Sequence, residues 1–150
     1  MRRTRRCAKH CRNPCRKAIY ADKSPAVDCD VEPGSRFDGD REDLLELLGN
    51  LLDNACKWCT SRVSVKATTT DGTCFLIEDD GPGCSPDALA VLTRRGFRAD
   101  ESRAGSGLGL AIVRDIVEGY GGTLQFGRSP ALGGMRVEVR LPDPASYGAN

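Results

Sequence analysis

A β-hairpin flanked by two helices is the strongest structural prediction that the sequence makes. Residues 62–79 hold two apolar, strand-like runs separated by Asp71-Gly72, a dipeptide typical of tight hairpin turns. Before this hairpin, apolar residues repeat at helical spacing over residues 40–60, and a second helical pattern occupies residues 107–120. Helices and hairpins mixed in this way favour architectures in which helices pack against a sheet.

The remaining segments complete a mixed sheet. Asp40 is a plausible N-cap for the first long helix, and a short helix is predicted after Pro86. Further strands are predicted at 27–32, 35–38, 123–127 and 134–141. A strict alternation of strands and helices is missing, which disfavours a doubly wound nucleotide-binding fold. We therefore predict an α/β, two-layer sandwich with the helices on one face of a mixed sheet.

Charge divides the chain into a basic arm and an acidic domain. Residues 1–20 carry eight Lys or Arg and no acid, which leaves 14 basic against 21 acidic residues in the remainder. We predict an arm at 1–17, a domain at 18–142 and a disordered tail at 143–150. The arm has too few aromatic residues for base stacking, so we expect no nucleic-acid partner. Without a long apolar run or a secretory signal, we expect no membrane insertion and a cytoplasmic location.

Eight cysteines do not predict a disulfide framework here. In a reducing compartment thiols stay free, and we expect Cys56, Cys59 and Cys74 to act as small buried hydrophobes. Cysteines spaced by four could share one helix face in the arm, where His10 lies among them: Cys7, Cys11 and Cys15. Their spacing does not match the common zinc sites, so a metal site there is disfavoured.

A polar stripe on the long helix is the first candidate site. Apolar positions should face the core: Leu44, Leu48, Leu51, Leu52 and Ala55. The opposite side carries Glu46, Asn50, Asn54 and Lys57 in one continuous stripe. Asn oxygen suits Mg²⁺ and Lys suits phosphate, but a simple solvated face is an equally good interpretation of the pattern alone.

Two glycine-rich segments supply the other candidates. An apolar strand ends at Asp79, and Gly81 and Gly83 follow, where a ligand could approach the backbone closely. Taken alone, this segment is better interpreted as an ordinary turn. Glycines also lead directly into the second helix, where free N–H groups could hold phosphate: Gly105, Gly107 and Gly109. The segment matches neither a P-loop nor a Rossmann motif.

In this order and within about 65 residues, the three segments resemble the N, G1 and G2 boxes of histidine-kinase ATPase domains. The resemblance covers residues 18–142, includes the closing strand at 134–142, and is closest to the PhoQ-type sensors. Histidine-kinase ATPase domains belong to a superfamily that also contains gyrase, the Hsp90 chaperone and the mismatch-repair MutL proteins. It implies ATP and Mg²⁺ as ligands. It also implies that the chain is the cytoplasmic portion of an inner-membrane sensor.

The resemblance implies a role for each matched residue. Asn54 would ligate Mg²⁺ and Lys57 would contact phosphate, with Asn50 assisting, and these three would form the catalytic set. Trp58 would cover the adenine ring, and Asp79 would accept a hydrogen bond from its amino group. Gly81 and Gly83 would shape the adenine pocket. The phosphates would be held by Gly105, Gly107, Leu108 and Gly109. Residues 84–104 would form a lid whose Arg94, Arg95 and Arg98 are candidates for phosphate contact.

The phosphorylatable histidine of these kinases is missing. Their acceptor lies beside an acid in an amphipathic helix, whereas the only histidine, His10, lies among Lys9, Cys11 and Arg12. We expect the chain to donate phosphate to a histidine on a separate dimerisation domain, with a response regulator as a further partner. The alternatives are a self-contained ATPase of the same superfamily and an anti-sigma-type serine kinase. Asn50 disfavours the first, because those ATPases carry a glutamate base there.

Overall fold

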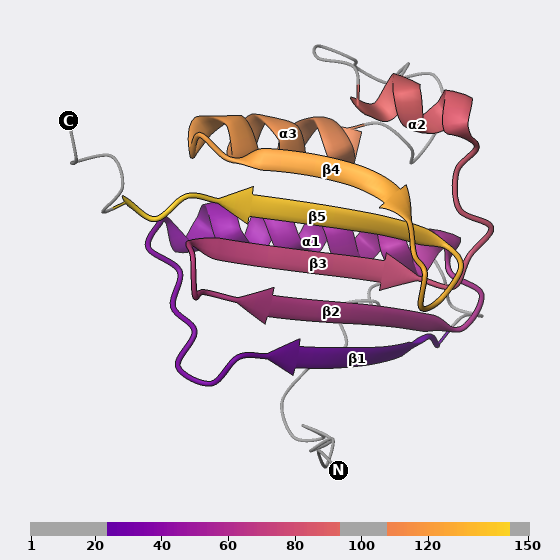
Figure 1. The fold of residues 1–150 in the computed structure, drawn as a ribbon, viewed down its shortest axis with the longest axis horizontal. Coiled ribbons are helices and arrows are strands. Elements are labelled where there is room, and N and C mark those ends of the chain that lie inside the picture. The colour runs from indigo at the N-terminus through magenta and orange to yellow at the C-terminus, as the bar shows by residue number, and fades with distance from the viewer. Residues whose placement is uncertain (1–23, 94–107, 145–150) are drawn as a thin grey trace.

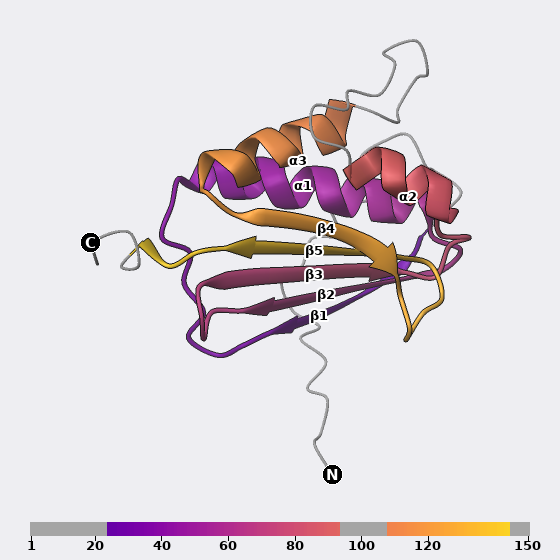
Figure 2. The same ribbon diagram turned by 45° about the horizontal axis from the view of Figure 1, so that its top comes forward.

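The computed structural model describes residues 24–93 and 108–144, which form one five-stranded sheet with helices on one face (Figures 1 and 2). Its elements are β1 (Ala26–Val31), α1 (Arg41–Trp58), β2 (Arg62–Thr68), β3 (Thr73–Asp79), α2 (Pro86–Thr93), α3 (Leu108–Gly119), β4 (Thr123–Arg128) and β5 (Met135–Leu141). The strand order is β1-β2-β3-β5-β4. Only β1 and β2 are parallel, and the other neighbours are antiparallel. The predicted two-layer α/β sandwich on a mixed sheet is confirmed.

Local chemistry sets both ends of α1. The Asp40 side chain accepts a 2.7 Å hydrogen bond from the backbone N–H of Glu42, as predicted for an N-cap. The helix ends at Trp58, and Cys59 takes the cap position with an extended backbone. Leu51 and Ala55 are buried as predicted, whereas fully buried Leu47 is missing from the residues that we expected in the core.

The β2–β3 hairpin forms the centre of the core. Along β2 every second side chain is buried against the helices: Val63, Val65 and Ala67. Gly72 adopts φ +82° in the connecting turn, and a Cβ there would lie 2.4 Å from the Leu141 carbonyl oxygen. The turn therefore requires glycine both for its conformation and for its contact with the end of β5.

Some predictions need correction and others lie outside the described residues. Residues 35–38 were predicted as a strand and form none. Cys56 is disulfide-bonded, which contradicts the prediction that it is a free thiol, although its burial is confirmed. The basic arm, most of the predicted lid and most of the predicted tail lie outside the described ranges. Within residues 24–93 and 108–144, no helix combines the length and apolar character needed to cross a membrane.

Candidate functional site

The fold brings the described parts of the three motifs to one end of the sheet. At this end α1 and β3 finish, α3 begins, and the β4–β5 turn closes over β3 (Figure 1). The contacts are short: a Cβ on Gly81, after β3, would lie 2.2 Å from the Trp58 carbonyl oxygen at the end of α1. We call this region the motif end of the domain.

Asp79 is the buried acid of the motif end, with only 3% of its surface exposed. Its Oδ1 accepts hydrogen bonds from the backbone N–H groups of Gly81, at 2.9 Å, and Met135, at 3.2 Å. Desolvation raises the pKa of Asp79, and these two N–H donors partly oppose that shift. Among the described residues nothing donates to Oδ2, and this atom is not among the fully buried unpaired atoms. One carboxylate oxygen is therefore fixed, and the other is available to a ligand.

Gly134 allows the β4–β5 turn to approach Asp79. Its backbone N–H donates to the Asp79 carbonyl oxygen at 3.0 Å. A Cβ on Gly134 would lie 2.3 Å from Asp79 Oδ1 and 2.6 Å from the backbone nitrogen of Gly81. Such distances are far below van der Waals contact, so no other residue fits without moving the site.

A second buried pair supports the same turn from the other face of the sheet. The Ser129 hydroxyl donates a 2.9 Å hydrogen bond to Glu78, and both residues are buried. The Ser129 backbone also bonds the Gly134 carbonyl oxygen at 2.8 Å, which closes the turn. The positions of Gly134 and of the Met135 N–H group are thereby tied to Glu78, the neighbour of Asp79 in the chain.

Asp80 has a role that sequence reasoning missed. Its Oδ1 accepts hydrogen bonds from three successive backbone N–H groups, those of Thr60, Ser61 and Arg62, at 2.9–3.0 Å. The Ser61 hydroxyl donates to Oδ2 at 2.9 Å. These donors outweigh desolvation and lower the pKa of Asp80 to about 2. Through these hydrogen bonds, Asp80 holds the α1–β2 connection against the end of β3.

Asn50, in the polar stripe of α1, lies next to α3 at the motif end. Asn50 donates to the Glu46 carbonyl oxygen at 2.8 Å, and its Oδ1 would lie 3.1 Å from a Cβ on Gly109. Asn54 and Lys57 are both partly buried. The Lys57 ammonium lies 5.3 Å from the centre of the Trp58 ring, and half of the Trp58 surface is exposed.

Several predicted site residues cannot be placed. Gly105, Gly107, Arg94, Arg95 and Arg98 lie outside the described residues, and for Leu108 only the helical backbone is described. Gly83 is described, with φ +70°, and a Cβ there would lie 3.5 Å from the backbone of Gly134, an ordinary contact distance. Among the residues with described placement, no cluster of three His, Cys, Asp or Glu is arranged to hold a metal ion.

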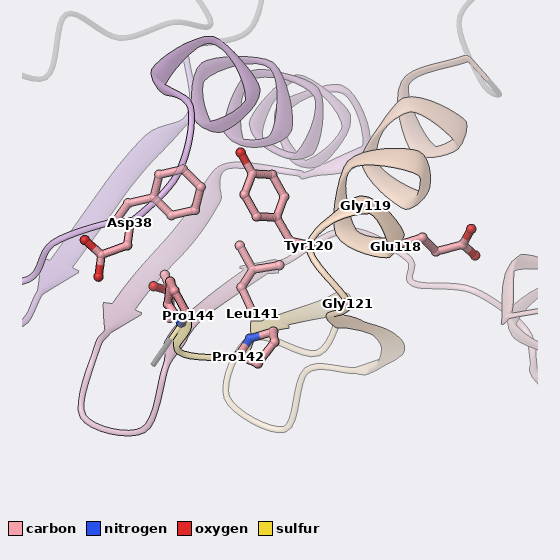
Figure 3. Close-up of a pocket in the computed structure, with 10 residues that line it drawn as sticks. Asp38, Glu118, Gly119, Tyr120, Gly121, Leu141, Pro142 and Pro144 are labelled. Atoms are coloured by element: carbon pink, nitrogen blue, oxygen red, sulfur yellow. The ribbon is translucent and has the colours of Figure 1, made fainter. Parts of the chain in front are cut away.

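A cavity of about 450 Å³ lies at the opposite end of the sheet (Figure 3). It lies between the end of α3 and the end of β5 and is lined by Phe37, Asp38, Thr73, Glu118, Tyr120, Leu141, Pro142 and Pro144 among others. None of the motif residues lines it. Its size is in the range of ligand pockets, but its position separates it from the motif chemistry.

Comparison with known proteins shows the family to which the chain belongs. The profile of the family described as "Histidine kinase-, DNA gyrase B-, and HSP90-like ATPase" matches residues 39–145. The chain belongs to this ATPase family. It is the ATP-binding domain characteristic of that family, and the predicted resemblance is confirmed.

Several proteins similar to this chain are sensor kinases. The sensor protein kinase CarS of Pseudomonas aeruginosa is 52% identical over 117 residues, covering 77% of this chain and 26% of that protein. The sensor protein PhoQ of Escherichia coli K12 is 42% identical over 122 residues, covering 81% and 25%. The structure of the mycobacterial sensor histidine kinase MprB superposes with a TM-score of 0.64 at 36% identity, covering 77% of this chain and 80% of that one. The chain thus spans about a quarter of the length of these curated relatives.

Other parts of the site were not predicted from the sequence. Gly134 and Met135 lie about 55 residues after Asp79, and only the β3–β5 pairing brings them beside it. The Gly133-Gly134 pair before the last strand was a visible signal, but it fitted an ordinary turn equally well. The Ser129–Glu78 pair left no recognisable pattern in the sequence.

Proposed function

We propose that this domain binds Mg-ATP and donates the γ-phosphate to a histidine on a separate dimerisation domain, within a two-component sensor kinase. The observation that carries the proposal is Asp79, buried at the motif end with one oxygen fixed and the other available. A carboxylate held in this way suits the exocyclic amine of adenine, because an ionised carboxylate accepts hydrogen bonds and donates none.

The remaining ligand contacts follow from the elements around Asp79. Trp58 offers an exposed ring for adenine, and Gly81 and Gly83 leave backbone rather than side chain at the pocket wall. The phosphates would lie between the polar stripe of α1 and the N-terminal end of α3, together with Gly105, Gly107, Leu108 and Gly109. We expect Lys57 to neutralise phosphate charge and the lid arginines to assist.

Mg²⁺ fits this end with few protein ligands. Magnesium keeps several waters and uses phosphate oxygens, so a single amide oxygen suits it better than a carboxylate cage. Asn54 would supply that oxygen, with Asn50 one turn earlier. When bound, the ion neutralises charge on the transferring phosphate.

Transfer to another protein is favoured over hydrolysis. Water needs a base held near the γ-phosphate, and Asn50 is a neutral amide whose Nδ2 is already used in a bond to the Glu46 carbonyl oxygen. No described histidine could accept the phosphate, and the only histidine of the chain, His10, lacks the flanking acid of an acceptor. The partners that we propose are therefore a histidine-bearing dimerisation domain and, after it, a response regulator.

We also propose that this ATP-binding domain is the cytoplasmic portion of an inner-membrane sensor.

Phosphate transfer in trans tests the proposal. The chain is mixed with γ-labelled ATP, Mg²⁺ and the dimerisation domain of the CarS relative, and acid-labile label on that domain is measured. We expect label on the added domain, slow ATP turnover by the chain alone, and loss of transfer for Asn54→Ala but not for its exposed neighbour Asp53→Ala. Acid-labile label on His10 of the isolated chain, abolished by His10→Ala, would contradict the proposal.

A further inference from the structure

Ser129 is the centre of the hydrogen bonds in the β4–β5 turn, and it is only 1% exposed. Its backbone N–H donates to the Gly134 carbonyl oxygen at 2.8 Å, and its carbonyl oxygen accepts from the Gly133 N–H at 2.9 Å. The hydroxyl accepts from the Leu132 N–H at 3.0 Å and donates to Glu78 at 2.9 Å. The first three of these bonds close the turn, and the bond to Glu78 attaches the turn to β3 (Figure 1).

The same turn leads into the N–H group that holds Asp79. The Met135 N–H donates to Asp79 Oδ1 at 3.2 Å, and the preceding Gly134 N–H donates to the Asp79 carbonyl oxygen at 3.0 Å. The Met135 bond is at the long end of the range for N–H···O bonds, whereas the Gly81 bond to the same oxygen is 2.9 Å long. A small displacement of the turn would therefore break the Met135 bond before the Gly81 bond.

The Glu78 side chain is buried on the sheet face opposite to Asp79, because successive residues of a strand point to opposite faces. Arg136 is its register neighbour on β5, but within the described part of the chain Arg136 pairs with Glu138, at 2.9 Å, and not with Glu78. Burying a carboxyl group and a hydroxyl costs free energy that two apolar side chains would not cost. The Ser129–Glu78 pair therefore contributes hydrogen-bond geometry rather than packing.

From these contacts we propose that Ser129 and Glu78 are positioning residues of the nucleotide site. Their hydrogen bond sets the position of the β4–β5 turn, so that the Met135 N–H holds Asp79 Oδ1 and leaves Oδ2 to the nucleobase. This inference rests on the proposed contact between Asp79 and adenine, and it extends that site to a pair on the other face of the sheet. Ser129 and Glu78 act on the affinity for the base through Met135 and Asp79.

Ser129→Ala tests the pair, because it removes the hydroxyl and keeps the backbone bonds of the turn. Calorimetric titration with adenosine, which has no phosphates, measures the base contact alone, and we expect about fivefold weaker binding. Glu78→Met should show the same loss, whereas Glu78→Gln, which keeps an oxygen for the Ser129 hydroxyl, should restore most of the affinity. The matched control is Ser35→Ala, which removes a hydroxyl bonded at 2.6 Å to the Glu32 carbonyl oxygen, at the opposite end of the sheet.

The pKa of Asp79 gives a second measurement, which a purely structural role would not change. Desolvation raises this pKa, and the Met135 N–H lowers it because a donor stabilises the ionised carboxylate. Loss of the Met135 bond in Ser129→Ala should therefore raise the Asp79 pKa further, as followed by NMR of the carboxyl carbon in the ligand-free protein. The Asp80 carboxylate and the Cys84 thiol also interact electrostatically with Asp79, and neither is changed in the variant.

Weaker adenosine binding and a raised Asp79 pKa in Ser129→Ala, with both unchanged in Ser35→Ala, would support the proposal. Circular dichroism checks folding, and Glu78→Met decides the outcome if Ser129→Ala does not fold. Adenosine affinity within twofold of wild type, an unchanged Asp79 pKa, or equal losses in Ser35→Ala would overturn the proposal. If the wild type binds neither ATP nor adenosine, the proposed function fails, and the Asp79 pKa of the ligand-free variants still decides whether the pair positions Asp79.

Discussion

The two ends of the sheet use carboxylates in opposite ways. At the motif end, the Asp79 carboxylate has one oxygen held by backbone N–H groups and one left available. At the other end, the Tyr120 hydroxyl donates to Asp43 at 2.7 Å and accepts from the Asp40 backbone N–H at 2.9 Å, so that both of its functions are used within the protein. Tyr120 also packs on Phe37, with ring centroids 5.6 Å apart.

This difference separates the end that we propose to bind ATP from an end that we call the structural end. A cavity of about 450 Å³ lies at the Tyr120 end, between the end of α3, the end of β5 and the segment before α1 (Figure 3). The motif end instead has glycines that let backbone surround a buried acid.

The largest loss of stability is expected when a methyl group is added at the motif end. Gly134→Ala places a Cβ 2.3 Å from Asp79 Oδ1 and close to two backbone atoms that cannot move independently. We expect a loss of about 3 kcal/mol in the free energy of unfolding, with weaker ATP binding. Gly127→Ala is the control, because a Cβ there meets nothing within 4 Å. Denaturant unfolding measures both, and equal stabilities would show that the turn is not tightly fitted.

A smaller effect is expected at Asp80, which supports the motif end without facing the ligand. Asp80→Ala removes the acceptor of three backbone N–H groups and should cost about 2 kcal/mol at neutral pH. The wild-type carboxyl has its pKa lowered from 3.8 to about 2, so its contribution is present above pH 4 and is lost as the pH falls toward 2. Acid unfolding curves should therefore be steeper over this window for wild type than for the variant. Parallel acid unfolding curves for the two proteins would contradict a stabilising role for the Asp80 carboxylate.

The smallest effect is expected at the structural end. Tyr120→Phe keeps the ring contact with Phe37 and removes both hydrogen bonds, and should lower the free energy of unfolding by about 1 kcal/mol. ATP affinity should not change, because the motif residues lie at the other end of the sheet. A loss of ATP affinity in a stable Tyr120→Phe variant would break the separation between the two ends.

The sequence predicted local structure better than long-range contacts. Three predictions follow from neighbouring residues: Asp40 as N-cap, a hairpin at Asp71-Gly72 and Asp79 at the end of a strand. All three hold in the structure. The strand expected at residues 35–38 does not form. Instead, the backbone N–H and the hydroxyl of Ser35 both donate to the Glu32 carbonyl oxygen and close a turn. Gly134 beside Asp79 depends on the β3–β5 pairing, which no local pattern specifies.

Titration of the full chain with ATP, measured calorimetrically for wild type and Asp79→Ala, tests the central claim most directly. If the available oxygen of Asp79 holds the adenine amine, the variant should bind ATP roughly ten- to a hundredfold more weakly, equivalent to about 1.5–3 kcal/mol. It should also lose preference for ATP over GTP, while the exposed turn variant Asp71→Ala binds as wild type does. Unchanged ATP affinity in a folded Asp79→Ala protein would contradict the assignment of the motif end as the adenine site.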